Sequence, residues 1–179
     1  MNLPFSNNKD TMKCIDIVNF FYDGKKANRS KVPYINHIIE GIAVIKARNF
    51  FNEEDIIGGY ALHPLVQQDD DLKRNLPVLH RFGVSPMLIA LATEYRNLAN
   101  AYLSHRKIES IYDIDLSPLS EVNEMLVADK VQNKKDFDLY HKGSHPRSDE
   151  LEEYFNNWLE RLNITDKMYK EYVKIMAKL

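Results

Sequence analysis

The apolar residues of this chain recur with the spacing of an amphipathic helix along almost its whole length. Four stripes with apolar residues three and four positions apart begin at Ile35, Leu88, Leu151 and Met168. Glycine is scarce, and no long segment alternates between apolar and polar positions as a half-buried strand does. The pattern therefore favours an all-α fold.

Helix start and stop signals agree with this periodicity. Ser85 and Ser117 each precede a proline, a combination that suits the start of a helix. Asn52 precedes three acidic residues, which favour the positive end of the helix dipole, and Gly83 fits a helix end. A pair of short strands in 107–114 is an alternative for that segment, and 140–148 is the longest predicted loop. Together the signals predict seven or eight helices, near residues 10–22, 34–48, 53–63, 71–81, 86–104, 118–135, 149–162 and 166–178.

Length and composition narrow the class of protein. A chain of 179 residues with a net charge of −2 fits a single domain covering 1–179. The single cysteine, Cys14, excludes an internal disulfide framework and a multi-cysteine zinc site, and it fits a reducing compartment. There is no membrane-spanning apolar run, no signal-peptide core and no basic excess for duplex nucleic acid. We therefore expect a cytoplasmic protein without membrane or duplex partners.

Asp129 stands at a position where the helical pattern expects an apolar residue. It follows Val122, Met125 and Leu126 on the inner face of its predicted helix. A buried carboxylate is costly unless it is paired or bound to a metal. Two interpretations are open: an ion pair with a nearby Lys or Arg, or a metal ligand.

Two histidines have a comparable setting. His63 ends the apolar stretch 56–62, and His37 lies close to a predicted helix start. Taken singly, such a histidine is more often an ordinary buried or surface imidazole than a ligand. The other histidines, His141 and His145 among them, are expected at the surface.

Two charged clusters each allow a structural and a functional interpretation. Lys25, Lys26, Arg29 and Lys31 form a basic segment that could be a solvated loop or a phosphate contact. The acidic run 69–71 fits the first turn of a helix, and it fits equally a general base or metal-bridging carboxylates.

Several segments, in this order, resemble the HD-domain metal-dependent phosphohydrolases, most closely the small stand-alone (p)ppGpp hydrolases. The resemblance extends from about Phe20 to Leu162, and its two most specific pieces are PYINH and ADKxxN. The segments are VPYINHIIEGIAVI (Val32–Ile45), IIGGYALHPLV (Ile56–Val66), RFGVSPMLIALATEY (Arg81–Tyr95), MLVADKVQNKKDF (Met125–Phe137) and DELEEYFNNWLERL (Asp149–Leu162).

The resemblance implies a helical bundle that binds a divalent metal, typically manganese, through His37, His63 and Asp129. It implies a nucleotide or nucleotide polyphosphate substrate, hydrolysed by a water whose pKa the metal lowers. In the guanosine tetraphosphate hydrolases this reaction removes pyrophosphate from the 3′ position. The substrate-binding positions implied in this sequence are Lys26, Arg29, Glu94, Lys130 and Asn133.

The sequence departs from this family at the metal site. Pro64 stands where the family has the aspartate of its His-Asp pair, and Gln67 and Gln68 stand where its Glu-Asp pair is expected. Proline offers no ligand and also removes a helical hydrogen bond to the carbonyl of Tyr60. We therefore expect weak, exchangeable metal binding. The candidates for the missing catalytic and compensating groups are Asp69, Asp70 and Gln68.

Three functions follow as alternatives. The chain could be a nucleotide (pyro)phosphohydrolase, a protein of the same fold that binds or sequesters a nucleotide without turnover, or a purely structural relative. Retention of His37, His63 and Asp129 favours the first two, whereas Pro64 favours the second. A stoichiometric transition metal in the purified protein would support the enzyme.

Overall fold

The computed structural model describes residues 9–27, 30–103 and 110–179. Over these residues the chain forms eight α-helices and, apart from an isolated bridge between Lys26 and Pro33, no β-structure. None of these helices combines the length and apolarity needed to cross a membrane. The all-α prediction is confirmed. The helices are α1 (Lys9–Tyr22), α2 (Tyr34–Arg48), α3 (Glu53–Leu62), α4 (Asp69–Arg81), α5 (Pro86–Leu103), α6 (Ser120–Tyr140), α7 (Ser148–Arg161) and α8 (Asp166–Met176).

Most observed helix bounds lie within two residues of the predicted ones, and the largest difference is at the end of α6. Helix α6 continues to Tyr140 instead of ending near residue 135, because its last turns have tertiary partners. Phe137 is buried there, and Asp138 accepts hydrogen bonds from Lys134 and from the Tyr169 hydroxyl, the latter at 2.6 Å. In the segment 107–114, the described part contains a short 3₁₀ turn, η2 (Ile111–Asp113), capped by the Ser110 side chain, and no strand.

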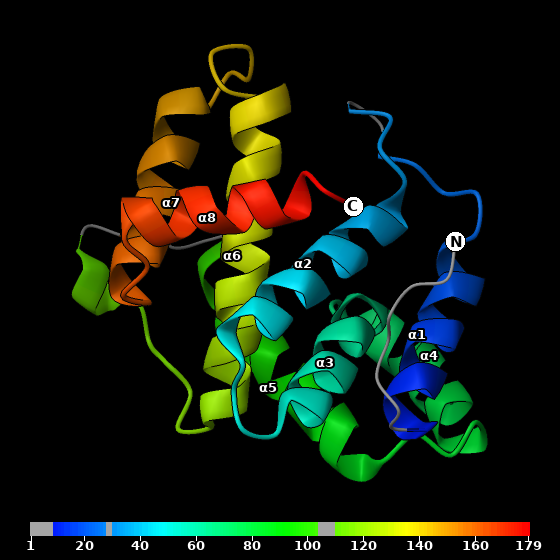
Figure 1. Cartoon of the computed structure of the whole chain (residues 1–179). Helices are drawn as coiled ribbons and strands as arrows, with labels where there is room; N and C mark the ends of the chain where they lie inside the picture. Colours follow the sequence, from blue (N-terminus) through cyan, green and yellow to red (C-terminus); the bar gives the residue numbers. More distant parts are fainter. Residues whose placement is uncertain (1–8, 28–29, 104–109) are drawn as a thin grey trace.

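Helix α3 lies at the centre of the bundle. Every residue from Ile56 to Leu62 is buried, and α1, α2, α5 and α6 pack around the helix (Figure 1). A helix that is apolar on all sides is stable only in such a surrounded position. Gly41 lets α2 approach α3 closely, since a Cβ atom there would lie 2.1 Å from the Tyr60 hydroxyl. The centre of the fold therefore holds the end of α3 firmly against α2.

A buried ion pair fixes the far end of α2 to α6 and α8. The Arg48 guanidinium donates to both carboxylate oxygens of Glu124, at 2.8 Å for Nη2 to Oε1, and Nη1 donates to the Tyr172 hydroxyl at 3.0 Å. Helix α8 crosses over α2 and α6, and α7 lies beside the second half of α6 (Figure 1). These contacts fix the end of α2 to the first half of α6.

Candidate metal centre

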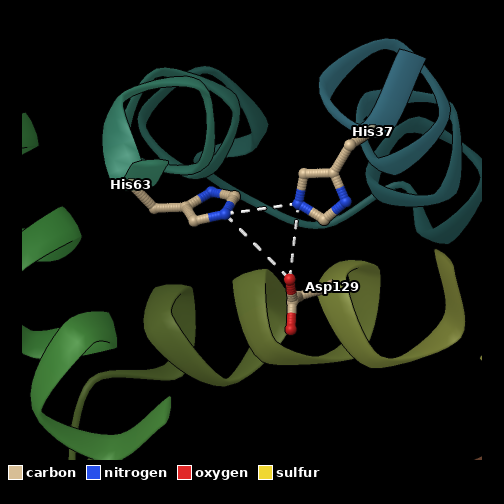
Figure 2. A group of neighbouring side chains, drawn as sticks. All are labelled: His37, His63 and Asp129. Atoms are coloured by element: carbon tan, nitrogen blue, oxygen red, sulfur yellow. Dashed lines mark hydrogen bonds and ion pairs between the residues drawn. The ribbon is translucent and has the colours of Figure 1, made fainter. Parts of the chain in front are cut away.

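Three segments each present one polar side chain to the same point between the helices. His37 lies in the first turn of α2, and Asp129 lies in the middle of α6. His63 begins the short 3₁₀ turn η1 (His63–Leu65) that directly follows α3. The two imidazole rings and the carboxylate face one another (Figure 2). The structure thus brings together the three residues that the resemblance implied as metal ligands.

The three facing atoms have the spacing of ligands around one ion. His37 Nε2 lies 3.3 Å from His63 Nε2 and 3.4 Å from Asp129 Oδ1, and His63 Nε2 lies 4.0 Å from the same oxygen. A circle through the three atoms has a radius of about 2.1 Å, within the range of zinc bonds to nitrogen and oxygen. Of the described residues, these three form the cluster of potential ligands that fits a metal ion.

Pro64 contributes to the orientation of His63. Because proline has no N–H, the Tyr60 carbonyl lacks its usual helical donor four residues on, and α3 ends at Leu62. That carbonyl lies 2.6 Å from His63 Nδ1, which donates to it. In a neutral imidazole the proton is then on Nδ1, and the lone pair is on Nε2. The predicted loss of the helical bond from residue 64 to Tyr60 is observed, and the Tyr60 carbonyl accepts from both the backbone N–H and the ring of His63.

His37 is oriented in the same way by a side chain. Its Nδ1 lies 2.6 Å from Gln132 Oε1, so Nδ1 donates and Nε2 keeps its lone pair. The Tyr60 hydroxyl donates to the His37 carbonyl at 3.2 Å and lies 3.4 Å from that Nε2. When both rings are neutral, two imidazole lone pairs and a carboxylate oxygen therefore converge on one point. This arrangement suits a cation, and such supported histidines are typical of metal sites.

Asp129 forms the ion pair that one of its two interpretations predicted, and its other oxygen lies where the second interpretation would place a metal ligand. Oδ2 accepts from Lys130 Nζ at 3.0 Å, and Oδ1 accepts from Asn133 Nδ2 at 2.8 Å while facing the histidines. Lys130 is 1% exposed, and its Nζ lies 4.8 Å from the centre of the Trp158 ring. The lysine is thus directed into the core, where it balances the charge of Asp129.

Electrostatics keep the cluster in the protonation state that a metal requires. Burial and the neighbouring His37 lower the pKa of His63 to about 3, although Asp129 acts in the opposite direction. Burial alone would raise the pKa of Asp129, but Lys130 and the two histidines hold it below its ordinary value. At neutral pH, His63 is therefore neutral and Asp129 is ionised. Two imidazoles and one carboxylate suit a first-row transition ion such as manganese, iron, cobalt or zinc.

A cavity of about 480 Å³ opens beside the cluster. This volume is within the ordinary range for small-molecule sites. The cluster forms one part of its wall, and Asn133 and Asp136 continue the polar part along α6. Aromatic rings and two further histidines line the rest: Tyr22, Tyr34, Phe137, Phe155, His141 and His145. A molecule with a planar apolar part and a polar group near the cluster would fit these surroundings.

The acidic run has the structural position that was predicted for it, the first turn of α4. Asp69 forms an ion pair with Arg96, which also donates to the Gln67 carbonyl, and the Asp69 side chain is 76% exposed. Asp70 and Gln68 are exposed as well, and none of the three lines the cavity. The structure therefore does not bring Asp69, Asp70 or Gln68 to the cluster, and their catalytic role stays a prediction.

The predicted substrate-binding residues lie in different places. Asn133 lines the cavity, whereas Lys130 points into the core. Glu94 accepts a hydrogen bond from Ser117 Oγ at 3.0 Å and does not line the cavity. Lys26 lines a neighbouring hollow of about 550 Å³ that shares Tyr22 as a wall. Arg29 lies outside the described residues.

The structure adds residues that the sequence analysis did not single out. His141 and His145, expected at the surface, are partly buried and line the cavity together with Phe137. The signal was their spacing: His141 lies four residues after Phe137, and His145 lies four residues after His141, although both belong to the turn that follows α6. Gln132 is a second such residue: it lies one turn after Asp129, a position from which it can support the site.

Comparisons with known proteins identify a shared fold. No family model matches the sequence, and no curated protein matches it. Among solved structures, the chain is similar to a protein described as a metazoan ortholog of SpoT that hydrolyzes ppGpp and plays a role in starvation responses. The TM-score is 0.68 with 16% sequence identity, and the match covers 97% of each chain. The HD-type helical fold that the resemblance implied is therefore confirmed.

Proposed function

We propose that this chain is a metal-dependent phosphohydrolase that acts on a nucleotide polyphosphate, with (p)ppGpp as the first substrate to test. The observation that carries this proposal is the convergence of His37, His63 and Asp129 on one point in the wall of a cavity. The fold shared with a protein described as hydrolysing ppGpp supports the choice of substrate. Manganese is the metal we propose, because the resemblance implies it and the Asp129 carboxylate is a ligand type that manganese prefers.

The chemistry divides between the ion and the chain. When bound, a divalent ion supplies a Lewis acid that lowers the pKa of water and polarises a phosphoryl oxygen. His37 and His63 hold their lone pairs toward the ion site because each donates its Nδ1 proton elsewhere. In the overall reaction, water adds to phosphorus, the bond between phosphorus and the 3′ oxygen breaks, and pyrophosphate leaves.

Other cavity residues can bind the substrate and move protons. The aromatic rings of Phe137, Phe155 and Tyr34 offer apolar surfaces for a base. Asp136, His141 and His145 line the cavity and are groups that accept or donate protons. These residues replace the α4 acids as the candidates for proton transfer, because they lie in the wall of the cavity and the α4 acids do not.

The test is release of pyrophosphate or phosphate from a substrate panel. The purified chain is incubated with Mn²⁺ and (p)ppGpp, deoxynucleotides, NADPH or cyclic nucleotides, and with EDTA in parallel. We expect Mn²⁺-dependent release from (p)ppGpp that Asp129→Asn abolishes and that His80→Gln leaves intact, since His80 is exposed on α4. If no substrate releases pyrophosphate or phosphate, the proposed hydrolase activity is contradicted.

A second candidate is a nucleotide-binding protein without turnover. The observation that favours it is the engagement of Asp69 with Arg96, which leaves the α4 acids away from the cluster. Calorimetry with the same nucleotides distinguishes the two functions. Binding of (p)ppGpp without product release in any metal would support the binding protein and exclude the hydrolase.

A further inference from the structure

We propose that Gln132 is a positioning residue that fixes the tautomer of His37 through a buried network with Glu40, Asp136 and Lys135. This inference deepens the proposed function, because it concerns how the same site is prepared for its ion. It assigns a role to residues that the resemblance implied neither as metal ligands nor as substrate-binding positions.

The orientation of the Gln132 amide is set by its two acceptor partners. Its Nε2 donates to Glu40 Oε2 and to Asp136 Oδ2, each at 2.9 Å. Ionised carboxylates only accept hydrogen bonds, so the amide nitrogen must face them. Gln132 is 1% exposed, so a flipped amide would leave its oxygen against carboxylates in a buried place. The amide oxygen is therefore the atom presented to His37.

The amide oxygen in turn dictates the proton position on His37. Gln132 Oε1 lies 2.6 Å from Nδ1, and an oxygen acceptor requires the proton on that nitrogen. A neutral imidazole has one ring N–H, so Nε2 then has a lone pair directed at His63 and Asp129. The opposite tautomer would place two lone pairs against each other across the 2.6 Å contact.

Lys135 joins the two carboxylates of the network. Its Nζ lies 2.8 and 2.6 Å from the two oxygens of Glu40 and 2.8 Å from Asp136 Oδ1. The network thus extends the familiar carboxylate–histidine–metal arrangement by one amide. The Gln132 amide is hydrogen-bonded to two carboxylates on one side and to His37 on the other. Because the amide is neutral, it adds no further negative charge beside His37.

Helices α2 and α6 each carry a proposed metal ligand and a residue of the supporting network. Glu40 lies one turn after His37 on α2, and Gln132 and Asp136 lie one and two turns after Asp129 on α6. Residues at these spacings share a helical face. The contact between α2 and α6 therefore brings the ligands and their supporting network into place in one step.

The tautomer can be measured directly in the metal-free protein. Long-range ¹H–¹⁵N spectra of the full chain distinguish the two ring tautomers, and His37→Gln assigns the His37 signals. We expect His37 to carry its proton on Nδ1 in the wild type. Gln132→Met, whose thioether accepts a hydrogen bond only weakly, should shift the population toward the Nε2 proton, whereas His80→Gln, at an exposed position on α4, should leave the His37 tautomer unchanged.

Metal affinity gives a second, separate readout. Gln132→Met should weaken Mn²⁺ binding by roughly 10- to 100-fold, and His80→Gln should leave it unchanged. An Nε2 proton on His37 in the wild type, or an unchanged tautomer in a folded Gln132→Met variant, would overturn the inference. If the wild type shows the expected tautomer but binds no metal, the positioning role of Gln132 stands and the proposed function fails.

Discussion

At the residue scale, the neighbouring Lys130 changes the effect that removing the Asp129 charge should have on stability. The sequence alone suggests that removing a buried charge at this position would leave the metal-free protein as stable or more stable. Lys130 changes that result, because its ammonium is buried and lies 3.0 Å from Asp129 Oδ2. No periodicity identifies such a partner, since the adjacent residue on a helix points elsewhere in most cases.

Asp129→Ala should therefore destabilise the metal-free protein by about 3–5 kcal/mol, because it leaves a buried ammonium without a counter-charge. The double variant Asp129→Ala/Lys130→Met should recover most of this loss. Urea unfolding in EDTA measures both. If Asp129→Ala is as stable as the wild type, the prediction is wrong, and the Lys130 ammonium has found another partner or water.

Acid should destabilise the protein through His63. Its pKa falls from an ordinary 6.5 to about 3 on folding, so between these values the unfolded chain binds a proton that the folded chain does not. Stability is therefore full above about pH 6.5 and declines as the pH falls toward 3. Urea midpoints in EDTA at about pH 7.5 and pH 5 should differ more for the wild type and His80→Gln than for His63→Gln. Equal differences would contradict the lowered pKa.

Pro64 supplies a third prediction at this scale. It lines the cavity directly after His63, so a carboxylate at this position would add a second negative charge beside the ion site. We expect Pro64→Asp to strengthen Mn²⁺ binding by at least roughly tenfold, the order of change that ligand-shell substitutions produce. Calorimetric titration of both proteins measures it. Weaker binding would show that the proline is needed for the His63–Tyr60 hydrogen bond.

At the element scale, periodicity and capping residues predicted all eight helices, because each buries an apolar stripe against the bundle. They did not predict how helices are joined across the core. The pairing of Arg48 with Glu124 connects α2 to α6, and both residues appear in the sequence as ordinary helix-surface charges. The last turns of α6 were missed for the same reason, since Asp138 is held there by Tyr169 from α8.

Arg48→Met should destabilise the protein by about 3–5 kcal/mol, because Glu124 is 6% exposed and would be left without its partner. Thermal or urea unfolding measures the loss, and Arg48→Met/Glu124→Leu should be closer to the wild type than the single variant. Lys142→Met is the matched control, since its ion pair with Glu152 is exposed and of small value. Equal losses of stability in Arg48→Met and Lys142→Met would contradict the structural role of the Arg48–Glu124 pair.

At the scale of the whole molecule, the resemblance predicted which three residues meet, and the order of helices brings them together. The supporting groups were not predictable in this way, because Gln132, Tyr60 and Lys130 act through distances that only the packed bundle sets. The cavity is likewise a property of the assembled helices. His141 and His145 reach it from the turn after α6, whereas Asp69 and Asp70 turn away with α4.

The central claim, a metal site made by His37, His63 and Asp129, is tested most directly by titrating the metal-free chain with Mn²⁺, Co²⁺ and Zn²⁺. We predict one saturable site per chain for at least one of these ions. His63→Gln and Asp129→Asn should lose that site, and His80→Gln should keep it. Absence of saturable binding in the wild type, or unchanged affinity in His63→Gln, would contradict the claim.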